Sequence, residues 1–353
     1  MRRSPLRVAI IAGTRYPIAQ PFAGGMEAHT WLLATGLLAG GHDVSVYAGP
    51  GSDPSIGRLE ILDDRPLDLS ADARADVSMP SEPFMREHHA YQRLMLRLAR
   101  DPSLDVVHNN SLHYLPVAMA GVLGVPMVTT LHTPPTPWLE SAITGSESIF
   151  VAVSEHTASR WSGRTTIDRV IRNGIDLASW SVGPGNGGFA VWSGRLVPEK
   201  GPHLAIDAAA EAGIPLVLAG PPSDTAYVRD EVLPRLGPMA SWVGHLDHAE
   251  LTRLVGAASV AVVTPCWDEP YGLVVAEAFA CGTPVAAFAR GAIPEIATPG
   301  CAALAEPGDV PGLAQAIRRA AGLDRSMARQ HAERTCSSTR MMAEYEQLYA
   351  DAA

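Results

Sequence analysis

The segment VAVVTPCWDEPYGLVVAEAFACGTPVAA (Val260–Ala287) joins apolar strands to an apolar helix, and the rest of the fold can be inferred by extending this pattern. The β-branched run Val260–Thr264 predicts a strand, Leu273–Ala280 predicts a buried helix, and Pro284–Ala287 predicts the next strand. Strands that alternate with helices in this way form a parallel sheet. The segment therefore predicts a βαβ unit of an α/β fold.

The same alternation extends over the whole chain and predicts two Rossmann-like halves. In the first half, strands are expected at Arg7–Ala12, His42–Ala48, Val106–His108, Pro126–Leu131, Ile149–Val153 and Ile167–Ile171. Helices between these strands are clearest at Glu27–Ala39, Glu82–Arg100 and Leu112–Leu123. In the second half, the additional strands are expected at Gly188–Ser193, Pro215–Ala219, Ala240–Val243 and Ala302–Leu304, with helices at His203–Ala212 and His248–Ala257.

The segment SVGPGNGG (Ser181–Gly188) separates the two halves, because its glycines and proline cannot sustain a helix or strand. It is interpreted as a linker or hinge. We therefore predict an N-terminal domain over residues 1–180, a C-terminal domain over 181–337 and a final helix over 338–353. This helix has no strand after it and is expected to cross back onto the first domain. A ligand is expected between the domains, at the C-terminal ends of both sheets.

Composition favours a globular enzyme of two domains. The chain has 353 residues, of which 47% are hydrophobic and 18% charged. Its net charge of −10 argues against nucleic acid as a partner. The apolar run Val8–Ala12 is too short for a signal peptide or a membrane span. The four cysteines lack zinc-site spacing and are expected to be free thiols, which favours the cytoplasm.

The only lysine, against 26 arginines, lies in SGRLVPEKG (Ser193–Gly201), between a predicted strand and a predicted helix. Such a turn is where an α/β fold binds phosphate, because backbone N–H groups and the helix dipole attract an anion there. Arg195 offers a planar fork and Lys200 a compact charge. We predict that both bind a phosphate group. The alternative is that Lys200 is an ordinary solvated side chain.

Two glutamates lie at different positions in the segment Val260–Ala287. Glu269 follows a strand, Glu277 lies eight residues later inside the helix, and Gly272 lies near the N-terminus of that helix. Free N–H groups at this terminus can hold phosphate oxygens, and carboxylates bind sugar hydroxyls strongly. The spacing predicts that Glu269 contacts the hexose of a nucleotide sugar and Glu277 its ribose. The alternative is that Glu277 is a solvated residue on an ordinary helix face. The apolar residues around it argue against this alternative, because they predict that most of the helix is buried.

The two-glutamate segment, GRLVPEKG (Gly194–Gly201) and IRNGID (Ile171–Asp176) together resemble the retaining glycosyltransferases of family 4, over essentially the whole chain. The resemblance implies the GT-B fold, in which two Rossmann-like domains face each other across a cleft. It implies a nucleotide-sugar donor held mainly by the C-terminal domain and an acceptor held mainly by the N-terminal domain. It implies that Arg195 and Lys200 bind the donor diphosphate, that Glu277 binds the ribose and that Glu269 binds the transferred sugar. Further implied donor contacts are Tyr271, Gly272 and Leu273. Gly244, His245 and Leu246 belong to a segment that is implied to face the base.

In the first half, PFAGGMEAHTW (Pro21–Trp31) places Gly24 and Gly25 between the first strand and its helix. Glycine there lets the backbone approach a phosphate, although such a pair often marks only a tight turn. The resemblance implies a loop that closes on the donor phosphate and reacting sugar. It also implies that His132, at the end of a strand in VTTLHTPP, contacts the sugar near the reacting bond. The alternative is a histidine that orders the proline-rich loop.

His108, Asn110 and Asn173 are candidates for the acceptor side of the cleft. Two of the motifs depart from the family pattern, because Asn110 stands where many relatives carry histidine and Arg172 where proline is frequent. The arginine-bearing helix Glu87–Arg100 could touch an anionic lipid or acceptor. A solvated amphipathic helix is the commoner explanation of this pattern, and the negative net charge of the chain favours it.

Retention of configuration requires either a covalent intermediate or front-face attack, and no motif supplies a nucleophilic carboxylate. We therefore expect front-face transfer, with Arg195, Lys200 and helix N-termini stabilising the leaving diphosphate. No metal or cofactor is expected, because no DxD-like cluster follows a strand and Asp63–Asp64 lies in an unpromising polar segment.

The sequence thus predicts a retaining hexosyltransferase that uses a nucleotide sugar, UDP being the base that the resemblance most often implies. The acceptor is expected to be a hydroxyl-bearing small molecule, lipid or glycan, and a lipid acceptor would place the protein at the inner membrane face. Alternatives are a nucleotide-sugar epimerase of the same fold and a non-catalytic sugar-binding module. A glycosidase that uses the two glutamates would leave the Arg195–Lys200 turn unexplained.

Overall fold

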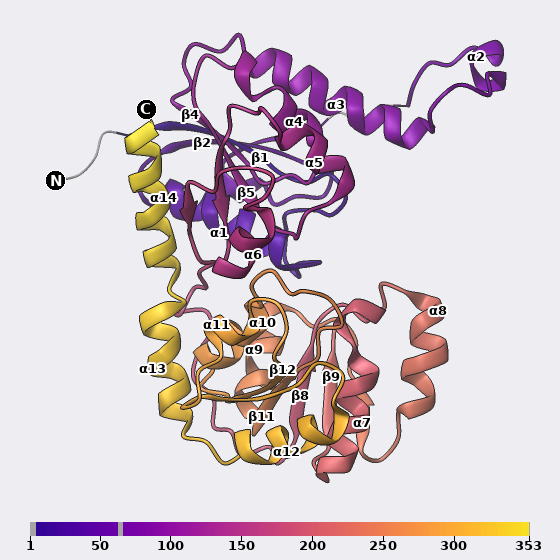
Figure 1. The fold of residues 1–353 in the computed structure, drawn as a ribbon, viewed down its shortest axis with the longest axis vertical. Coiled ribbons are helices and arrows are strands. Elements are labelled where there is room, and N and C mark those ends of the chain that lie inside the picture. The colour runs from indigo at the N-terminus through magenta and orange to yellow at the C-terminus, as the bar shows by residue number, and fades with distance from the viewer. Residues whose placement is uncertain (1–4, 63–65, 353) are drawn as a thin grey trace.

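The computed structural model describes residues 5–62 and 66–352, which form two parallel sheets covered by helices (Figure 1). The first sheet has the order β3-β2-β1-β4-β5-β6-β7 and the second the order β10-β9-β8-β11-β12-β13. The first-sheet strands are β1 (Arg7–Ile11), β2 (Asp43–Ala48), β3 (Arg58–Ile61), β4 (Val106–Asn109), β5 (Met127–Leu131), β6 (Ile149–Ala152) and β7 (Arg169–Val170). The second-sheet strands are β8 (Ala190–Ser193), β9 (Leu216–Ala219), β10 (Ala240–Trp242), β11 (Val260–Val263), β12 (Val285–Phe288) and β13 (Ala302–Ala305). The predicted α/β fold of two Rossmann-like halves is confirmed.

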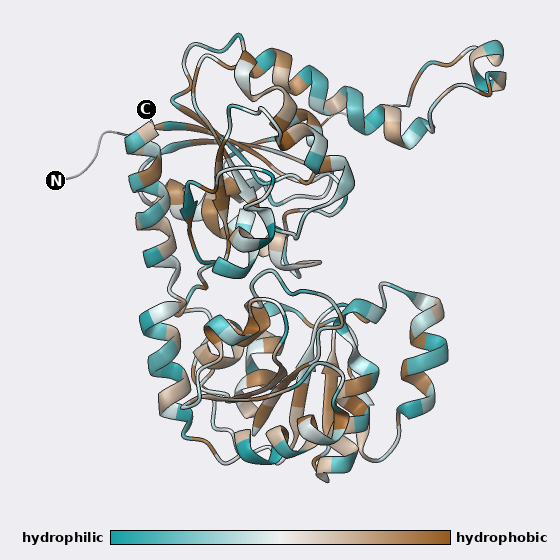
Figure 2. Cartoon of the chain, in the orientation of Figure 1, coloured by the Kyte–Doolittle hydropathy of each residue, from teal (hydrophilic) through white to brown (hydrophobic). Residues whose placement is uncertain are grey.

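The central strands of the N-terminal sheet are buried on both faces, as their apolar residues require. Val8 and Ile10 of β1 pack in one cluster with α1 (Gly25–Ala39), whereas Ala9 and Ile11 pack in another with α3 (Glu82–Leu98). This alternation follows from the two-residue period of a strand. Figure 2 shows the result, with brown strands inside and teal on the outer faces of the helices.

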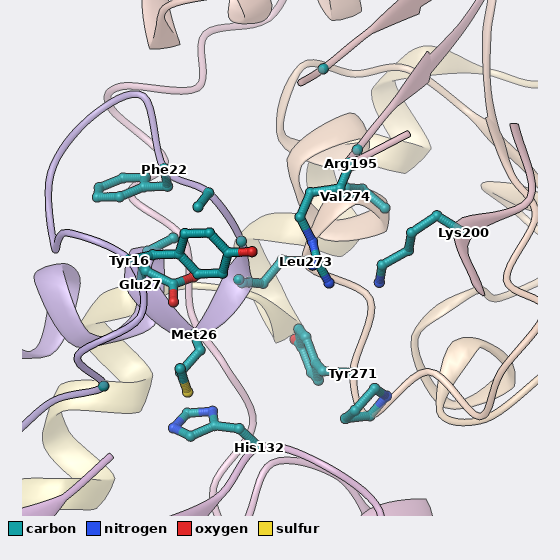
Figure 3. Close-up of a pocket in the computed structure, with 18 of the residues that line it drawn as sticks. Tyr16, Phe22, Met26, Glu27, His132, Arg195, Lys200, Tyr271, Leu273 and Val274 are labelled. Atoms are coloured by element: carbon teal, nitrogen blue, oxygen red, sulfur yellow. The ribbon is translucent and has the colours of Figure 1, made fainter. Parts of the chain in front are cut away.

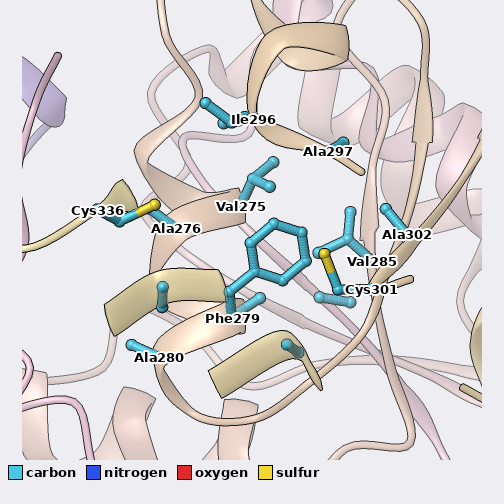
Figure 4. Packing of buried hydrophobic residues seen from close by; sticks show 14 of the residues in the cluster. Val275, Ala276, Phe279, Ala280, Val285, Ile296, Ala297, Cys301, Ala302 and Cys336 are labelled. Carbon is cyan, nitrogen blue, oxygen red and sulfur yellow. The ribbon is translucent and has the colours of Figure 1, made fainter. Parts of the chain in front are cut away.

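The helix α10 (Leu273–Ala280) is the most enclosed helix around the predicted donor site. Phe279 packs with Val275, Val285 and Cys301 between this helix and the sheet (Figure 4). The opposite face of the sheet is covered by α7 (Pro202–Ala212) and α12 (Val310–Ala320). Tight packing beneath α10 fixes the position of its N-terminus relative to the strand ends.

The final helix α14 (Ser338–Ala352) lies on the N-terminal domain (Figure 1). It packs against α1, and its buried face joins the core of the first sheet. The residues on that face are Met341, Met342, Tyr345, Leu348 and Tyr349. The chain therefore passes between the domains twice, and the two passages are joined where Ile175 and Ser337 form a parallel bridge.

The interpretation of Ser181–Gly188 as a hinge needs correction. The segment contains no helix or strand, but its backbone is bonded to the C-terminal domain. Gly183 N–H donates to the Cys281 carbonyl (3.1 Å), Gly185 N–H donates to the Gly256 carbonyl (2.9 Å), and Arg325 donates to the Gly183 carbonyl. These bonds make the segment part of the second domain. The passages between the domains instead lie at Ile175 and Ser337.

Contacts across the domain interface gather at the N-terminus of α6 (Glu155–Trp161). The Ser154 hydroxyl donates to the Pro270 carbonyl over 2.6 Å. The Glu295 carboxylate accepts the backbone N–H groups of Glu155 (3.0 Å) and His156 (2.5 Å). An acidic side chain from one domain thus caps a helix of the other, next to the loop that carries Glu269.

Two of the differences from the sequence predictions have a clear physical reason. The edge strand β3 was not predicted, because RLEI is short and mostly exposed and is recognisable as a strand only through its pairing with β2. The helix expected at Leu112–Leu123 is shorter, α4 (Tyr114–Ala118) followed by a 3₁₀ turn. The His113 ring accepts the Leu115 N–H, so this helix begins after His113. No helix in the described ranges combines the length and apolarity needed to cross a bilayer.

Candidate active site

A cavity of about 820 Å³ lies between the two domains, at the C-terminal ends of the central strands of both sheets. This is where the topology predicted a ligand. Figure 3 shows Glu27 and Tyr16 of the N-terminal domain on one side, with Arg195 and Lys200 of the C-terminal domain on the other. The predicted site residues that line it are Gly24, Gly25, His132, Asn173, Arg195, Lys200, His245, Leu246, Glu269, Tyr271, Gly272, Leu273 and Glu277.

Lys200 ends the short 3₁₀ turn Pro198–Lys200 between β8 and α7. The turn is fixed by Thr264, whose hydroxyl lies 3.0 Å from the Lys200 carbonyl and 2.9 Å from that of Gly201. Gly201 adopts a left-handed conformation (φ 61°), and a Cβ there would lie 2.4 Å from the Thr264 carbonyl. A residue with a side chain does not fit at Gly201, so glycine is required for Lys200 to take this position.

The Lys200 ammonium donates to Glu269 Oε2 over 2.6 Å and lies over the Trp267 ring. The Trp267 indole donates to the same oxygen over 3.0 Å. Glu269 is also held through its backbone, because a Cβ on Gly291 would lie 2.3 Å from the Glu269 nitrogen and oxygen. The structure thus pairs the cation expected at the diphosphate with the carboxylate expected at the transferred sugar.

Arg195 follows β8 on the same wall as Lys200, and both side chains point into the cavity (Figure 3). Its guanidinium lies 3.6 Å from the Glu199 carboxylate. A planar guanidinium and a compact ammonium next to each other suit the several oxygens of a diphosphate.

The N-termini of α1 and α10 meet across the cavity. Gly272 precedes α10 in a left-handed conformation (φ 97°), and a Cβ there would lie 2.6 Å from Ile293. A Cβ on Gly25, at the start of α1, would lie 2.9 Å from the Leu273 side chain at the start of α10. Two helix N-termini therefore face the same space, and both favour an anion there.

Glu277 lies in the second turn of α10, at the base of the cavity. Its side chain is half-buried, and burial raises the pKa of its carboxyl group to about 7. Tyr271 is 2% exposed and packs into the core beneath the same loop. Glu277 is one of the residues that line the cavity, so it is not a solvated residue on an outer helix face.

His132 lines the cavity at the end of β5 and is held from behind. Its Nε2 lies 2.8 Å from Asn110 Oδ1, and its ring packs edge-on against His29 at 4.8 Å. Burial, followed by the nearby His29 and His108 rings, holds the pKa of His132 well below its usual range. His132 is therefore neutral at physiological pH.

Three predicted residues lie off the cavity wall, which corrects their expected positions. His108 is fully buried between Thr130 and the Tyr349 hydroxyl of α14, so it belongs to the core of the N-terminal domain. Asn110 is buried behind His132. Gly244 lies next to the wall, where its carbonyl accepts the Gly220 N–H.

Glu27 lines the cavity and was missed as a site residue. It is 5% exposed, and its carboxylate folds back over the start of α1, with Oε2 3.1 Å from where a Gly24 Cβ would lie. Burial raises the pKa of Glu27, while its own backbone N–H, Arg195 and Arg15 act in the opposite direction. An acidic residue directly after a glycine pair at a helix start was the available signal.

The acidic pair Asp63–Asp64 lies outside the described residues. Within residues 5–62 and 66–352, no three or more His, Cys, Asp or Glu side chains gather as metal ligands would.

Two family models match the chain. The model described as Glycosyltransferase Family 4 matches residues 23–179, and the model described as Glycosyl transferases group 1 matches residues 181–335. The chain is 29% identical to a glycogen synthase of Mycobacterium tuberculosis, over 89% of this chain and 85% of that protein. It is 27% identical to a D-inositol 3-phosphate glycosyltransferase of Mycolicibacterium smegmatis, over 99% of this chain and 92% of that protein.

Solved structures share the fold at lower sequence identity. Alr3699/HepE of Anabaena, solved in complex with UDP-glucose, has a TM-score of 0.77 at 18% identity, covering 98% of this chain and 100% of that one. AviGT4, a glycosyltransferase involved in avilamycin A biosynthesis, has a TM-score of 0.69 at 22% identity, covering 98% and 97%.

Proposed function

The chain belongs to the glycosyltransferases of family 4 and group 1, which have the GT-B fold, and from this premise we propose that it transfers a hexose-type sugar from a UDP-sugar to a hydroxyl-bearing acceptor with retention of configuration. The likeness to a protein solved with UDP-glucose supports the choice of donor. The acceptor occupies the half of the cavity formed by the N-terminal domain.

The pairing of Arg195 and Lys200 on one wall, facing the N-termini of α1 and α10, is the observation that carries this proposal. These groups place two cationic side chains and two helix dipoles around one space, which is what a departing diphosphate needs. In this role Arg195 and Lys200 bind the diphosphate, and backbone N–H groups near Gly272 and Gly25 bind its remaining oxygens.

The two glutamates of the C-terminal domain bind the hydroxyl groups at either end of the donor. Glu277, deep in the cavity, accepts hydrogen bonds from the ribose, and Glu269 accepts them from the transferred sugar. Glu269 is oriented for this by Lys200 and Trp267. His132, whose Nε2 is bonded to Asn110, directs its other ring nitrogen to a sugar hydroxyl.

The transfer proceeds on one face of the sugar. The bond between the anomeric carbon and the phosphate oxygen breaks, and its electron pair leaves with the diphosphate. The acceptor oxygen forms the new bond on the same face, and its proton passes to the departing phosphate oxygen. Lys200, Arg195 and the helix N-termini stabilise the developing charge, so the mechanism requires neither a metal nor a cofactor.

A thermal-shift comparison of UDP-, GDP- and ADP-sugars tests the donor, because a ligand that binds the folded protein raises its melting temperature. The UDP-sugar should give the largest shift, and NMR of the glycosylated product should show the anomeric configuration of the donor. Inversion would contradict front-face transfer. An isomeric nucleotide sugar formed without acceptor would indicate an epimerase, and glycan binding without nucleotide binding would indicate a non-catalytic module.

A further inference from the structure

The acceptor half of the cavity contains more negative than positive side chains. Glu27 and Glu87 line it, and Arg15 is the cationic residue on the same wall among the described residues of the N-terminal domain. Arg15 is exposed, with its guanidinium 5.3 Å from the Tyr16 ring centroid. Glu87 lies near the same loop and accepts a hydrogen bond from the Thr14 hydroxyl over 2.6 Å.

Glu27 is the more enclosed of the two carboxylates. Only 5% of its surface is exposed. Figure 3 shows it next to Tyr16, across the cavity from Arg195. Burial penalises its charge, and Arg195 from the other domain is one of the groups that offset this penalty. In the proposed reaction Arg195 is engaged by the donor diphosphate. A donor-loaded site therefore weakens the contribution of Arg195 to Glu27 and leaves Arg15 as the nearby cation on the acceptor side.

Aromatic rings line the same half of the cavity beside Glu87: Tyr91 lies one turn after Glu87 on α3, and His113 and Tyr114 lie at the start of α4. The His113 ring stacks between Tyr91 and Tyr114, with centroid distances of 4.4 and 4.7 Å. Burial, followed by His88, lowers the pKa of His113 to about 4, so the stack carries no positive charge at neutral pH. Trp138, 57% exposed, adds a ring at the rim of the same wall. Tyr91 is buried and both faces of His113 are covered, so Tyr114 and Trp138 are the rings of this group with accessible surface. Aromatic faces pack against the ring faces of a cyclic ligand and against cations.

We infer that the acceptor is a polyhydroxylated ring that carries an ammonium group, such as an amino sugar or an aminocyclitol, held by Glu27 and Glu87 against the rings of Tyr114 and Trp138. The inference rests on the proposed function, because it takes this half of the cavity as the acceptor site. The ammonium group compensates for the weakened contribution of Arg195 to Glu27. A phosphorylated acceptor would instead place an anion near two carboxylates and the donor diphosphate.

The test compares three ligands that differ in one group: methyl glucosaminide, methyl glucoside and methyl glucoside 6-phosphate. Their dissociation constants are measured by NMR titration below the pKa of the amine, on protein loaded with whichever of UDP, GDP or ADP gives the largest thermal shift. The amine should bind at least about tenfold more tightly than the neutral glucoside, as expected from a charge-assisted hydrogen bond, and the phosphate most weakly.

Variants assign the preference to the carboxylates. Glu27→Gln should reduce the amine preference to within about threefold, since the amide keeps the shape but loses the charge. Glu87→Gln should reduce it by a smaller factor, and it tests the inference separately if Glu27→Gln does not fold. Glu140→Gln removes a carboxylate from the same domain outside the cavity and should leave the preference unchanged.

Tightest binding of the phosphate ligand would overturn the inference, as would an amine preference that survives both Glu27→Gln and Glu87→Gln. Failure of all three ligands to bind the nucleotide-loaded protein would overturn it as well. Nucleotide binding is measured first and separately. If none of UDP, GDP and ADP binds, the proposed function fails, whereas nucleotide binding without the predicted acceptor order removes only the present inference.

Discussion

Lys200 and Glu269 hold each other in position, so each has a role in the geometry of the site as well as in ligand binding. The ammonium, Glu269 Oε2 and the Trp267 indole form one connected group. A donor that enters the cavity finds this group already ordered, which lowers the cost of assembling the site during the reaction.

Lys200→Ala should lower kcat by on the order of ten- to a thousandfold, because it removes one charge contact to the leaving diphosphate. The Lys200 side chain is about a quarter exposed and belongs to no core cluster, so any fall in the melting temperature should come only from the loss of its pair with Glu269. Steady-state kinetics with the donor found by thermal shift measure the effect. Turnover close to that of the wild type would remove Lys200 from the assigned role.

Glu277 should make donor binding depend on pH. Its pKa is raised to about 7 by burial, and ribose hydroxyls that donate to the carboxylate favour the ionised form. Below pH 7 the free site is protonated and binding must release a proton, so the donor dissociation constant should rise by up to about tenfold per pH unit as the pH falls. Above about pH 7 it should be flat.

The variant Glu277→Gln isolates the contribution of Glu277, because the diphosphate of a nucleotide sugar is esterified at both ends and stays fully ionised over this pH range. The variant should bind more weakly at high pH and lose the part of the pH dependence that belongs to Glu277. Isothermal titration in buffers of different ionisation enthalpy counts the released protons. Equal proton release by wild type and variant would show that Glu277 does not ionise on binding.

At the scale of the elements, the loop Asp268–Pro270 depends on the close approach of another segment. Gly291 has φ 62°, a Cβ there would lie 2.3 Å from Glu269 backbone atoms, and the Ala292 N–H donates to the Glu269 carbonyl. The position of a binding carboxylate is thus set by a glycine more than twenty residues later in the chain.

Gly291→Ala should therefore displace Glu269 and weaken donor use by on the order of a hundredfold, as expected for a shift of about 1 Å in a positioned group. Gly308→Ala is the matched control, because Gly308 also has a left-handed conformation (φ 82°) but no atom lies within 4 Å of its Cβ position. The control should lose about 1 kcal/mol of stability from backbone strain alone and keep its activity. Urea denaturation and kinetics of both variants separate strain from displacement.

The sequence predicted the elements whose pattern is local and missed features that depend on distant partners. Strands such as Val260–Val263 are recognisable because both of their faces are buried. The edge strand β3 is defined only by its pairing with β2. His108 was a candidate for the acceptor side of the cleft, but α14, from the far end of the chain, covers it. The charge balance around Glu27 appears only when both domains are in place.

At the scale of the whole molecule, α14 completes the N-terminal core from the end of the chain. Tyr345 is fully buried, its hydroxyl lies 3.0 Å from that of Thr130, and its ring packs near His29 and His108. These histidines lie directly behind His132. The last helix therefore supports one wall of the active site from behind.

Tyr345→Ala should lower the free energy of unfolding by about 3–5 kcal/mol, the usual cost of emptying a large buried aromatic site. Arg340→Ala, on the exposed face of the same helix, removes only a pair with Glu344 and should cost less than about 0.5 kcal/mol. Urea denaturation followed by circular dichroism compares the two. Equal effects would mean that α14 is a peripheral attachment.

Because α14 crosses back onto the first domain, the two domains need not complete their folding in the order in which they are synthesised. The strands of the N-terminal sheet are made first, but the helix that closes their core is made only after the entire C-terminal domain. On the ribosome the second domain can reach its final packing while the first still exposes the apolar surface that Tyr345 and Tyr349 will cover. The domain that is translated earlier is thus the one that completes its core later.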